Sequence, residues 1–270
     1  MKKVLITGAG SGLGRALALR YGQAGADVCV ADVNQEGGQE TVSQIEAAGG
    51  SAFFQGCDIT QQWDVDKLAI ALAERWQSLD VLVNNAGVAS AGSIESERLE
   101  QWQWVLEINL LGQVRMTKAM LPLLRKSTAD NRDIINIASQ AGLTPAPGMG
   151  SYSVTKAAMV SFAETAHLEF AHEGIHVSVV CPSFFDTNLN QSLRSDDAGM
   201  QAVVTKMIKK SGVSADSIAE QVIKDVHARK FMVITHKEGR KAHRLKRFLP
   251  IERYLKIVKD RTKKFVKAND

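Results

Sequence analysis

The chain alternates short apolar runs typical of β-strands with longer stretches of helical periodicity, and this alternation constrains its fold more than any other feature. Such an order is built from βαβ units, whose strands are parallel and whose crossovers are right-handed. The expected strands are Lys3–Thr7, Asp27–Asp32, Ser51–Gly56, Val81–Asn84, Asp133–Ala138, Ile175–Cys181 and Phe231–Ile234. The expected helices are Gly12–Ala24, Glu36–Ala48, Gln61–Trp76, Leu99–Lys126, Ser151–Glu173 and Ala215–Arg229. The sequence therefore predicts a doubly wound α/β fold with a seven-stranded, mostly parallel sheet and helices on both faces.

The chain length favours a single core. With 270 residues, 45% of them hydrophobic, the chain can bury one large α/β core. We assign residues 1–235 to this domain and residues 236–270 to a basic tail. Residues 184–212 form a long insert after the sixth expected strand.

A glycine-rich turn, Thr7-Gly-Ala-Gly-Ser-Gly-Leu-Gly14, follows the first expected strand. Gly8 can make the tight turn, Gly12 lets the backbone approach a pyrophosphate, and Gly14 permits close packing of helix on strand. The following helix offers free N–H groups and a positive dipole end to phosphates. The predicted dinucleotide contacts here are Gly8, Ser11, Gly12, Leu13 and Gly14. A tight turn without a ligand is the alternative, and the acid that follows disfavours it.

That acid is Asp32, which ends the second expected strand 18 residues beyond Gly14. A carboxylate there can accept hydrogen bonds from an adenosine ribose diol, and it repels an added 2′-phosphate. Ser11 and Val33 offer no positive charge to such a phosphate. We therefore predict NAD(H) rather than NADP(H); an ordinary turn aspartate at the strand end is the alternative.

Two further strand ends are predicted to contact the adenosine half. Asp58 and Ile59 end the third strand, although a helix-capping role for Asp58 or Thr60 is equally favoured. The stretch Asn84–Gly87 ends the fourth strand. Its small residues let the backbone pass near the cofactor, and its amides can tie neighbouring strands together. The predicted contacts here are Asn85, Ala86 and Gly87, with a structural role favoured over direct contact.

Tyr152 and Lys156 stand four residues apart, so in a helix both project from one face. An ammonium beside a phenol favours the phenolate and lowers the Tyr pKa toward the range of a proton-transfer catalyst. Ser139 precedes the tyrosine by 13 residues and Asn109 precedes it by 43. In isolation such a pair is typical of a helix surface; in register with a dinucleotide site it indicates an alcohol/ketone oxidoreductase.

Taken in order, Thr7–Gly14, Asn84–Gly87, Asn109, Ser139 and the Tyr152/Lys156 pair resemble the short-chain dehydrogenase/reductase family over roughly residues 1 to 185. The resemblance implies a Rossmann-type fold, with Tyr152 as general acid/base and Ser139 polarising the substrate carbonyl. Lys156 would bind the nicotinamide ribose and keep the pKa of Tyr152 low. Asn109 would anchor a water chain from the lysine to solvent.

The resemblance also extends to the stretch after the sixth strand. Thr187 matches a position where the family has a threonine on the cofactor carboxamide. Pro182 is expected to contact the cofactor, but Ser183 stands where the family often has glycine, which alters the loop path near the nicotinamide. The insert 184–212 is expected to form a substrate lid.

The residues around this lid are mostly apolar. The predicted substrate pocket contains Ser139, Leu143, Met149, Tyr152, Phe184, Phe185 and Leu189. An apolar substrate body beside one reacting oxygen follows, although several of these side chains also suit packing of the lid on the domain.

The basic character of the chain is confined to its tail. Residues 236–270 hold 13 Lys and Arg against 4 Asp and Glu, a net charge of +9, whereas the remainder holds 20 against 25, a net charge of −5. Pro250 can start a helix. Within that helix an apolar stripe recurs at Ile251, Leu255, Val258, Thr262 and Phe265, with Tyr254 and Val266 beside it. A basic amphipathic helix suits an anionic membrane surface or an acidic groove. Packing on the domain or on a second subunit is the alternative.

The sequence also bears on nucleic-acid binding, metal binding, cellular location and subunit assembly. No nucleic-acid recognition fold accompanies the basic tail, and Cys29, Cys57 and Cys181 favour buried thiols over a disulfide framework or a metal site. We expect a cytoplasmic protein, with the inner face of a membrane as a peripheral location. The resemblance implies a homodimer or homotetramer formed through the helices Leu99–Lys126 and Ser151–Glu173.

The leading interpretation is an NAD(H)-dependent oxidoreductase acting on a secondary alcohol or ketone. Two alternatives stay open: a non-catalytic NAD-responsive binding protein, and an NADP(H)-dependent ketone or 3-oxoacyl reductase. The complete set of Asn109, Ser139, Tyr152 and Lys156 argues against the first, since a sensor does not need all four. The enoyl-reductase branch usually spaces its Tyr and Lys more widely.

Overall fold

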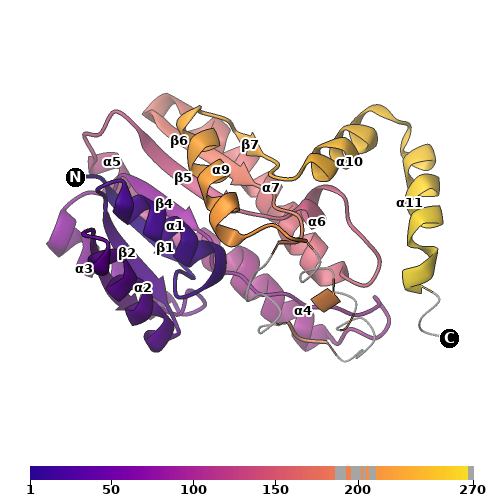
Figure 1. Ribbon diagram of the computed structural model, residues 1–270, viewed down its shortest axis with the longest axis horizontal. Coiled ribbons are helices and arrows are strands. Elements are labelled where there is room, and N and C mark those ends of the chain that lie inside the picture. Colours follow the sequence, from indigo (N-terminus) through magenta and orange to yellow (C-terminus); the bar gives the residue numbers. More distant parts are fainter. Residues whose placement is uncertain (186–192, 196–201, 203–204, 207–210, 267–270) are drawn as a thin grey trace.

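The computed structural model contains one seven-stranded sheet with helices on both faces (Figure 1). It describes residues 1–185, 193–195, 202, 205–206 and 211–266. The strands are β1 (Lys3–Thr7), β2 (Asp27–Asp32), β3 (Ser51–Gly56), β4 (Val81–Asn84), β5 (Arg132–Ile137), β6 (Ile175–Val180) and β7 (Met232–Val233). Their order is β3-β2-β1-β4-β5-β6-β7, and each neighbouring pair is parallel. The predicted doubly wound α/β fold is confirmed, and the strand ends differ from the expected ones by at most one residue.

Two apolar clusters, one on each side of the sheet, hold the helices in place. The alternation of strand side chains separates the clusters, because successive residues point to opposite faces. Val4 and Ile6 pack with α1 (Gly12–Gln23), α2 (Gln35–Ala47) and α9 (Ala215–His227). Leu5 between them packs with the helices of the other face, which are α3 (Gln62–Trp76), α5 (Gln113–Lys126) and α7 (Gly150–Phe170).

The helix expected over Leu99–Lys126 is interrupted. It consists of α4 (Leu99–Leu106), a π-helical turn η1 (Glu107–Gly112) and α5. Single π turns inside α-helices frequently mark functional positions. Here the turn carries Asn109, so the prediction of one uninterrupted helix was wrong at that residue.

Smaller differences occur elsewhere. The helix expected over Ser151–Glu173 ends in a 3₁₀ turn, η2 (Ala171–Glu173), and a short helix, α6 (Gln140–Leu143), follows β5. The tail forms two helices, α10 (Lys237–Phe248) and α11 (Ile251–Val266). Among the described residues, no helix has the length and hydropathy that a membrane crossing requires.

The apolar stripe predicted for α11 was misplaced. Tyr254 is the buried side chain, at 5% exposure, whereas Ile251 and Leu255 are 47% and 55% exposed. α11 packs against α10 and stands apart from the sheet (Figure 1). The tail therefore leaves apolar as well as basic side chains in solvent.

Asparagine side chains join the carboxyl ends of the central strands, where the motifs gather. Asn84 Nδ2 donates to Asn136 Oδ1 of β5 at 2.9 Å and to Thr117 Oγ1 of α5 at 2.9 Å. Asn85 Nδ2 donates to the carbonyl oxygens of Thr7 and Gly8 at 2.9 and 3.0 Å. The expected structural role of these amides is confirmed. They fix β1 and β4 at the point where the strand order reverses, which is where ligands bind in sheets of this kind.

Candidate active site

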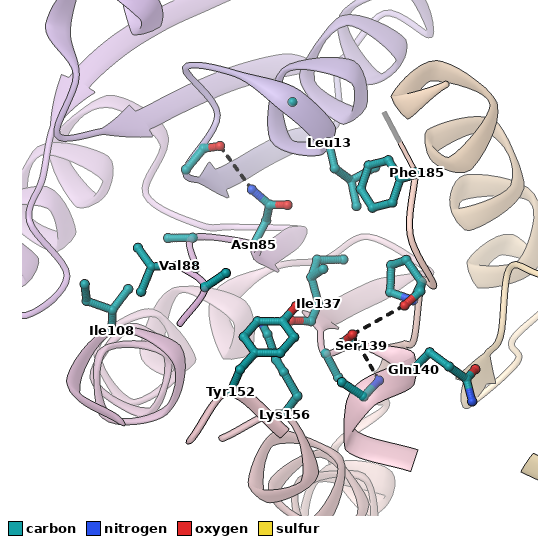
Figure 2. Close-up of a pocket in the computed structure, with 18 of the residues that line it drawn as sticks. Leu13, Asn85, Val88, Ile108, Ile137, Ser139, Gln140, Tyr152, Lys156 and Phe185 are labelled. Carbon is teal, nitrogen blue, oxygen red and sulfur yellow. Dashed lines mark hydrogen bonds between the residues drawn. The ribbon is translucent and has the colours of Figure 1, made fainter. Parts of the chain in front are cut away.

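A cavity of about 540 Å³ opens at this reversal point, between the glycine-rich turn and α6 (Figure 2). Most of the predicted site residues line it: Gly8, Ser11, Gly12, Leu13, Asp32, Asp58, Ile59, Asn85, Ala86, Gly87, Ser139, Met149, Tyr152, Lys156, Pro182, Phe184 and Phe185. Gly14, Asn109 and Leu143 are absent from the lining. Thr187 and Leu189 lie outside the described residues.

The glycine-rich turn needs its glycines for two reasons. Gly8 and Gly12 have φ values of +64° and +55°, a region that residues with a Cβ rarely adopt. A Cβ on Gly8 would lie 2.7 Å from Ala86 Cα, and one on Gly14 would lie 2.2 Å from Gly8 O. Gly14 therefore serves the packing of α1 on β1, while the turn in front of it faces the cavity.

The start of α1 is suited to an anion. Its N-cap residue, Ser11, makes no side-chain capping bond, so it leaves the first N–H groups of the helix unoccupied by that side chain. These N–H groups and the helix dipole favour a phosphate at the cavity wall. The residues present thus fit a dinucleotide.

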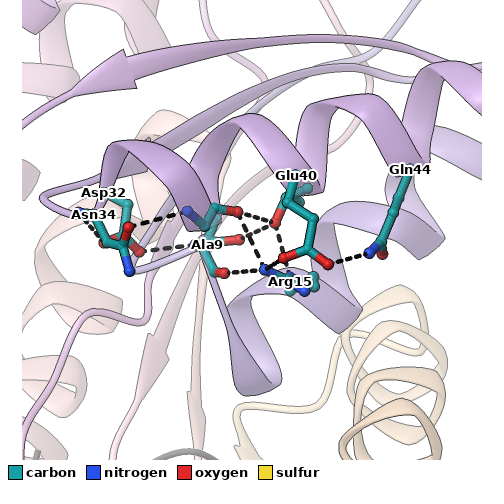
Figure 3. A network of polar contacts seen from close by, with 9 residues as sticks. Ala9, Arg15, Asp32, Asn34, Glu40 and Gln44 are labelled. Carbon is teal, nitrogen blue, oxygen red and sulfur yellow. Dashed lines mark hydrogen bonds and ion pairs between the residues drawn. The ribbon is translucent and has the colours of Figure 1, made fainter.

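Asp32 fastens the turn to the end of β2 (Figure 3). Its Oδ2 accepts from the Gly10 N–H at 2.8 Å, and its Oδ1 accepts from the Asn34 N–H at 2.9 Å. Arg15, which sequence reasoning missed, donates to Gly10 O at 2.6 Å and pairs with Glu40 at 2.8 Å. A carboxylate thus lies beside the cavity, and the cation near the same turn is engaged by another acid.

Asp58 lies at the cavity and orders the turn that follows it, while the N-cap residue of α3 is Gln61. The Oδ1 of Asp58 accepts from the N–H and the hydroxyl of Thr60 at 2.9 and 2.8 Å. This bonding holds the turn ahead of α3 and leaves Ile59, next in the chain, against the cavity.

Ser139, Tyr152 and Lys156 meet at the inner end of the cavity (Figure 2). Ser139 follows β5 and caps α6, where its Oγ accepts from the Ala141 N–H at 3.1 Å. Tyr152 and Lys156 lie in the first two turns of α7 and are 7% and 4% exposed. The Tyr152 side chain lies beside Ser139 at the cavity wall (Figure 2). Lys156 Nζ donates to Ile137 O at 2.9 Å and lies 5.8 Å from the centre of the Tyr152 ring.

Burial dominates the ionisation of this group. It raises the pKa of Tyr152 above its usual value, and the neighbouring Ser139 hydroxyl offsets only part of that rise. Burial also lowers the pKa of Lys156 to about 8. The expectation that the lysine lowers the pKa of Tyr152 is therefore not met in the protein alone, because the amine is directed at a backbone carbonyl and both groups are desolvated.

Asn109 lies next to the cavity without lining it. Its Oδ1 accepts from the Val88 N–H at 2.8 Å, and its Nδ2 donates to Val88 O at 2.9 Å and to Thr155 Oγ1 at 3.2 Å. A Cβ on Gly87 would lie 3.2 Å from Asn109 Oδ1 and 3.4 Å from Lys156 Nζ. Asn109 thus braces the loop after β4 against α7, close to the lysine amine.

The apolar end of the cavity differs in detail from the prediction. Met149, Phe184 and Phe185 line it as expected, and Ala141, Thr144 and Ala146 also do so. Leu143 does not: it is 6% exposed within the core cluster under α7, so its assignment to the pocket was wrong. α6 places successive residues on different sides, and no sequence pattern had indicated that short helix.

The tail reaches the border of the cavity, which sequence reasoning missed. Lys246 Nζ of α10 donates to Leu143 O at 2.7 Å, and the Ser183 N–H donates to His236 Nδ1 at 3.2 Å. A Cβ on Gly239 would lie 2.3 Å from Gln140 Oε1. α10 therefore packs directly behind residues that line the cavity, and a Cβ at Gly239 would displace the end of the Gln140 side chain.

Comparisons with known proteins agree with this geometry. The family model described as short chain dehydrogenase matches residues 2–198. A 2,5-dichloro-2,5-cyclohexadiene-1,4-diol dehydrogenase, LinX, from Sphingobium indicum is 36% identical over 195 residues, which cover 72% of this chain and 77% of the relative.

Two solved structures resemble the chain over most of its length. A short chain dehydrogenase/reductase from Burkholderia phymatum in complex with NAD superposes with a TM-score of 0.84 at 27% identity, covering 91% of this chain and 92% of the other. A short-chain dehydrogenase from Sphingobium yanoikuyae in complex with NADPH gives 0.75 at 25% identity, covering 89% and 91%.

Proposed function

The chain belongs to the short-chain dehydrogenase/reductase family of oxidoreductases, and from this premise we propose that it transfers a hydride between NAD(H) and a secondary alcohol or ketone with an apolar body. One observation carries the proposal. Tyr152 and Lys156 are buried beside the half-buried Ser139 at the inner end of a cavity whose other end is the glycine-rich turn. A nicotinamide cofactor bound there supplies or takes up the hydride.

The protein's own residues handle the proton and the substrate oxygen. In reduction, the Tyr152 hydroxyl donates its proton to the ketone oxygen as the carbonyl carbon gains the hydride, so ketone, hydride and proton give the alcohol. In oxidation, Tyr152 takes the proton back. Ser139, which lines the cavity beside Tyr152, holds the same oxygen. Lys156 adds positive charge beside the phenol, and Asn109 holds the loop that borders the amine.

Asp32 favours NAD(H) over NADP(H). Its carboxylate sits where the adenosine ribose of a dinucleotide on this fold is bound, and a 2′-phosphate there would meet a negative charge. Ser11 remains neutral, and Arg15 is paired with Glu40. Fluorescence titration with NADH and NADPH tests the preference, and tighter binding of NADPH would contradict it.

The apolar end of the cavity favours an uncharged substrate body. The side chains beyond Tyr152 are those of Ala141, Ala146, Met149 and Phe184, with Thr144 as a polar exception. A series of secondary alcohols of rising chain length should therefore show rising kcat/KM until the cavity is full. Exclusive turnover of small charged polyols would contradict this class.

The decisive experiment is an assay of NAD⁺ reduction with secondary alcohols and of NADH oxidation with ketones, each with wild-type protein and Tyr152→Phe. We expect turnover only in the wild type. Saturable NADH binding without turnover of any substrate would support the non-catalytic NAD-responsive alternative. Turnover with NADPH alone would support the NADP(H)-dependent reductase.

We further propose that the tail contacts an anionic membrane surface. Phe248, Ile251 and Leu255 are 80%, 47% and 55% exposed at the junction of two helices rich in Lys and Arg, a combination typical of interfacial helices. Cosedimentation with vesicles of anionic and of zwitterionic lipid, using the full chain and a chain lacking residues 251–270, tests the contact. Equal behaviour of the two chains would contradict it.

A homodimer or homotetramer is also proposed. The outer face of α7 exposes Val154 and Leu168 at 49% and 76%, and Leu111 of the η1 turn is 44% exposed. Light scattering coupled to size exclusion measures the assembly, and a monomer at micromolar concentration would contradict it.

A further inference from the structure

Four carboxylates of the described residues are buried outside the groups assigned to chemistry or cofactor binding, and Glu97 is the one bonded to the residue before Tyr152; the others are Asp80, Asp133 and Asp225. Glu97 is 7% exposed and lies two residues before α4. Its Oε1 accepts from the hydroxyls of Ser90 and Ser151, the latter at 2.5 Å, and its Oε2 accepts from the Ser151 N–H at 3.4 Å. Burying a carboxylate is costly unless hydrogen bonds compensate it, so these three donors account for its presence here.

The partner Ser151 immediately precedes Tyr152 in the first turn of α7. The first N–H groups of a helix have no partner within the helix, and negative charge beside them is favourable. Met149, the N-cap residue of α7, makes no side-chain capping bond. Glu97, from a distant part of the chain, therefore supplies the acceptor that this helix start lacks.

The partner Ser90 lies in a segment that is hydrogen-bonded to two distant parts of the chain. The Gly92 N–H donates to Gly148 O at 2.9 Å, just ahead of α7. The Arg194 N–H donates to Ala89 O at 3.1 Å, and the Ala91 N–H donates to Arg194 O at 3.0 Å. Leu193, next to that arginine, packs in one apolar cluster with Met149 and Tyr152. Glu97 thus joins three segments that surround the tyrosine.

We propose that Glu97 is a positioning residue for the active site: by holding Ser90 and Ser151 together, it fixes the first turn of α7 and so the reach of the Tyr152 hydroxyl toward Ser139 and the substrate oxygen. Glu97 itself lines no part of the cavity. The inference rests on the proposed role of Tyr152 and adds a residue that acts through it. Misplacing a catalytic group by about 1 Å costs on the order of 10²-fold in rate.

The test compares Glu97→Ala, Glu97→Gln and the matched control Glu100→Ala, which removes an exposed carboxylate three residues away. We expect Glu97→Ala to lower kcat about 10- to 100-fold while the dissociation constant of NADH stays within about twofold, because the glycine-rich turn and Asp32 are untouched. Glu97→Gln keeps an acceptor for both hydroxyls and should recover most of kcat. The control should match the wild type.

The same assay measures whether Glu97 and Ser151 act on kcat through one shared contact. Ser151→Ala should lower kcat in the same direction, and the double variant should lose no more than the worse single variant, because both changes break one link. Multiplicative losses, or an unchanged kcat in Glu97→Ala, would overturn the proposal. Equal losses of kcat and NADH affinity without recovery by Glu97→Gln would do the same, since they indicate general destabilisation.

A second measurement does not depend on turnover. Hydrogen exchange followed by mass spectrometry should show faster exchange in residues 149–156 of Glu97→Ala than of the wild type, with residues 215–227 of α9 unchanged. If the wild type turns over no substrate, the proposed function fails while this measurement still decides the positioning role. Equal exchange in residues 149–156 of both proteins would overturn it.

Discussion

At the scale of single residues, the proposed chemistry rests on the buried Tyr152 and Lys156 and the half-buried Ser139. The protein environment favours the neutral phenol and lowers the pKa of the amine to about 8, so neither side chain is held in its charged form by the other. A positively charged nicotinamide nearby would favour the phenolate. We infer that the ionisation needed for oxidation depends on the bound cofactor.

The hydroxyl of Tyr152 is the sole difference between that residue and Phe. Tyr152→Phe should lower kcat about 10²- to 10⁴-fold, the usual contribution of a positioned general acid/base, and leave the dissociation constant of NADH within about twofold. Steady-state assays and fluorescence titration measure the two quantities. Wild-type kcat in this variant would remove Tyr152 from the mechanism.

Lys156 predicts a pH-dependent stability. Its pKa is lowered from 10.5 to about 8, so between these values the unfolded chain binds a proton that the folded chain has released. The folded state therefore gains stability from this group as pH rises through that window, and below it the buried ammonium costs roughly 3 kcal/mol.

Lys156→Met removes this cost. The free energy of unfolding of the variant, minus that of the wild type, should fall by roughly 3 kcal/mol between pH 7 and pH 10.5. Urea titrations of both proteins measure it. The subtraction is needed because Tyr152 and the three buried cysteines have raised pKa values and titrate with the opposite sign. A pH-independent difference would contradict the lowered pKa.

Asp32 predicts the cofactor preference. Asp32→Asn keeps an oxygen that can accept from the Gly10 N–H but removes the charge, so binding of NADPH should tighten relative to NADH by about tenfold. Titration with both cofactors measures the ratio. Asp58→Asn, at another point of the same cavity, is the control and should leave the ratio unchanged.

At the scale of elements, the sequence predicted the regular strands and helices, but it did not predict where a helix is interrupted. Most strands of this sheet are rich in β-branched or aromatic residues, and β1 to β4 were predicted with their observed ends. The π turn at Glu107–Gly112 lies inside an uninterrupted helical pattern. It is held by tertiary bonds from Asn109 to Val88, far away in sequence. No local pattern could indicate it.

For the cavity, the sequence predicted most of the lining residues but not their ionisation or every side-chain orientation. Motif residues follow strands, and parallel strands bring their carboxyl ends to one edge, so most predicted contacts line one cavity. The pKa of Tyr152 and the orientation of Leu143 depend on burial and on the packing of α6, which a sequence does not state.

The two tail helices predict different effects of truncation. α10 contacts the loops at Leu143 and Ser183, whereas α11 contacts α10. Removal of residues 251–270 should leave kcat and KM for a water-soluble ketone within about twofold of wild type. Lys246→Met should raise KM severalfold, because the 139–149 loop loses an anchoring bond. Lys241→Met, on an exposed position of the same helix, is the control.

At the scale of the whole molecule, charge and function are segregated. The body carries a net charge of −5 and the tail +9, so the molecule is strongly dipolar although its total charge is only +4. Association with any anionic surface should therefore weaken as salt rises, because a Debye length of about 8 Å at physiological ionic strength screens exposed charges. Vesicle binding of the full chain across a salt series measures this effect. Binding insensitive to salt would indicate an apolar contact through Phe248 and its neighbours.

The bond between Lys246 and Leu143 links positions more than a hundred residues apart. Ribosomes extend a chain from its N-terminus at about 5 to 20 residues per second, and domains begin to fold while synthesis continues. The nascent polypeptide can thus assemble its dinucleotide crevice before the wall behind the substrate loop has been translated. The bond to Leu143 forms only once the segment around residue 246 has left the exit tunnel.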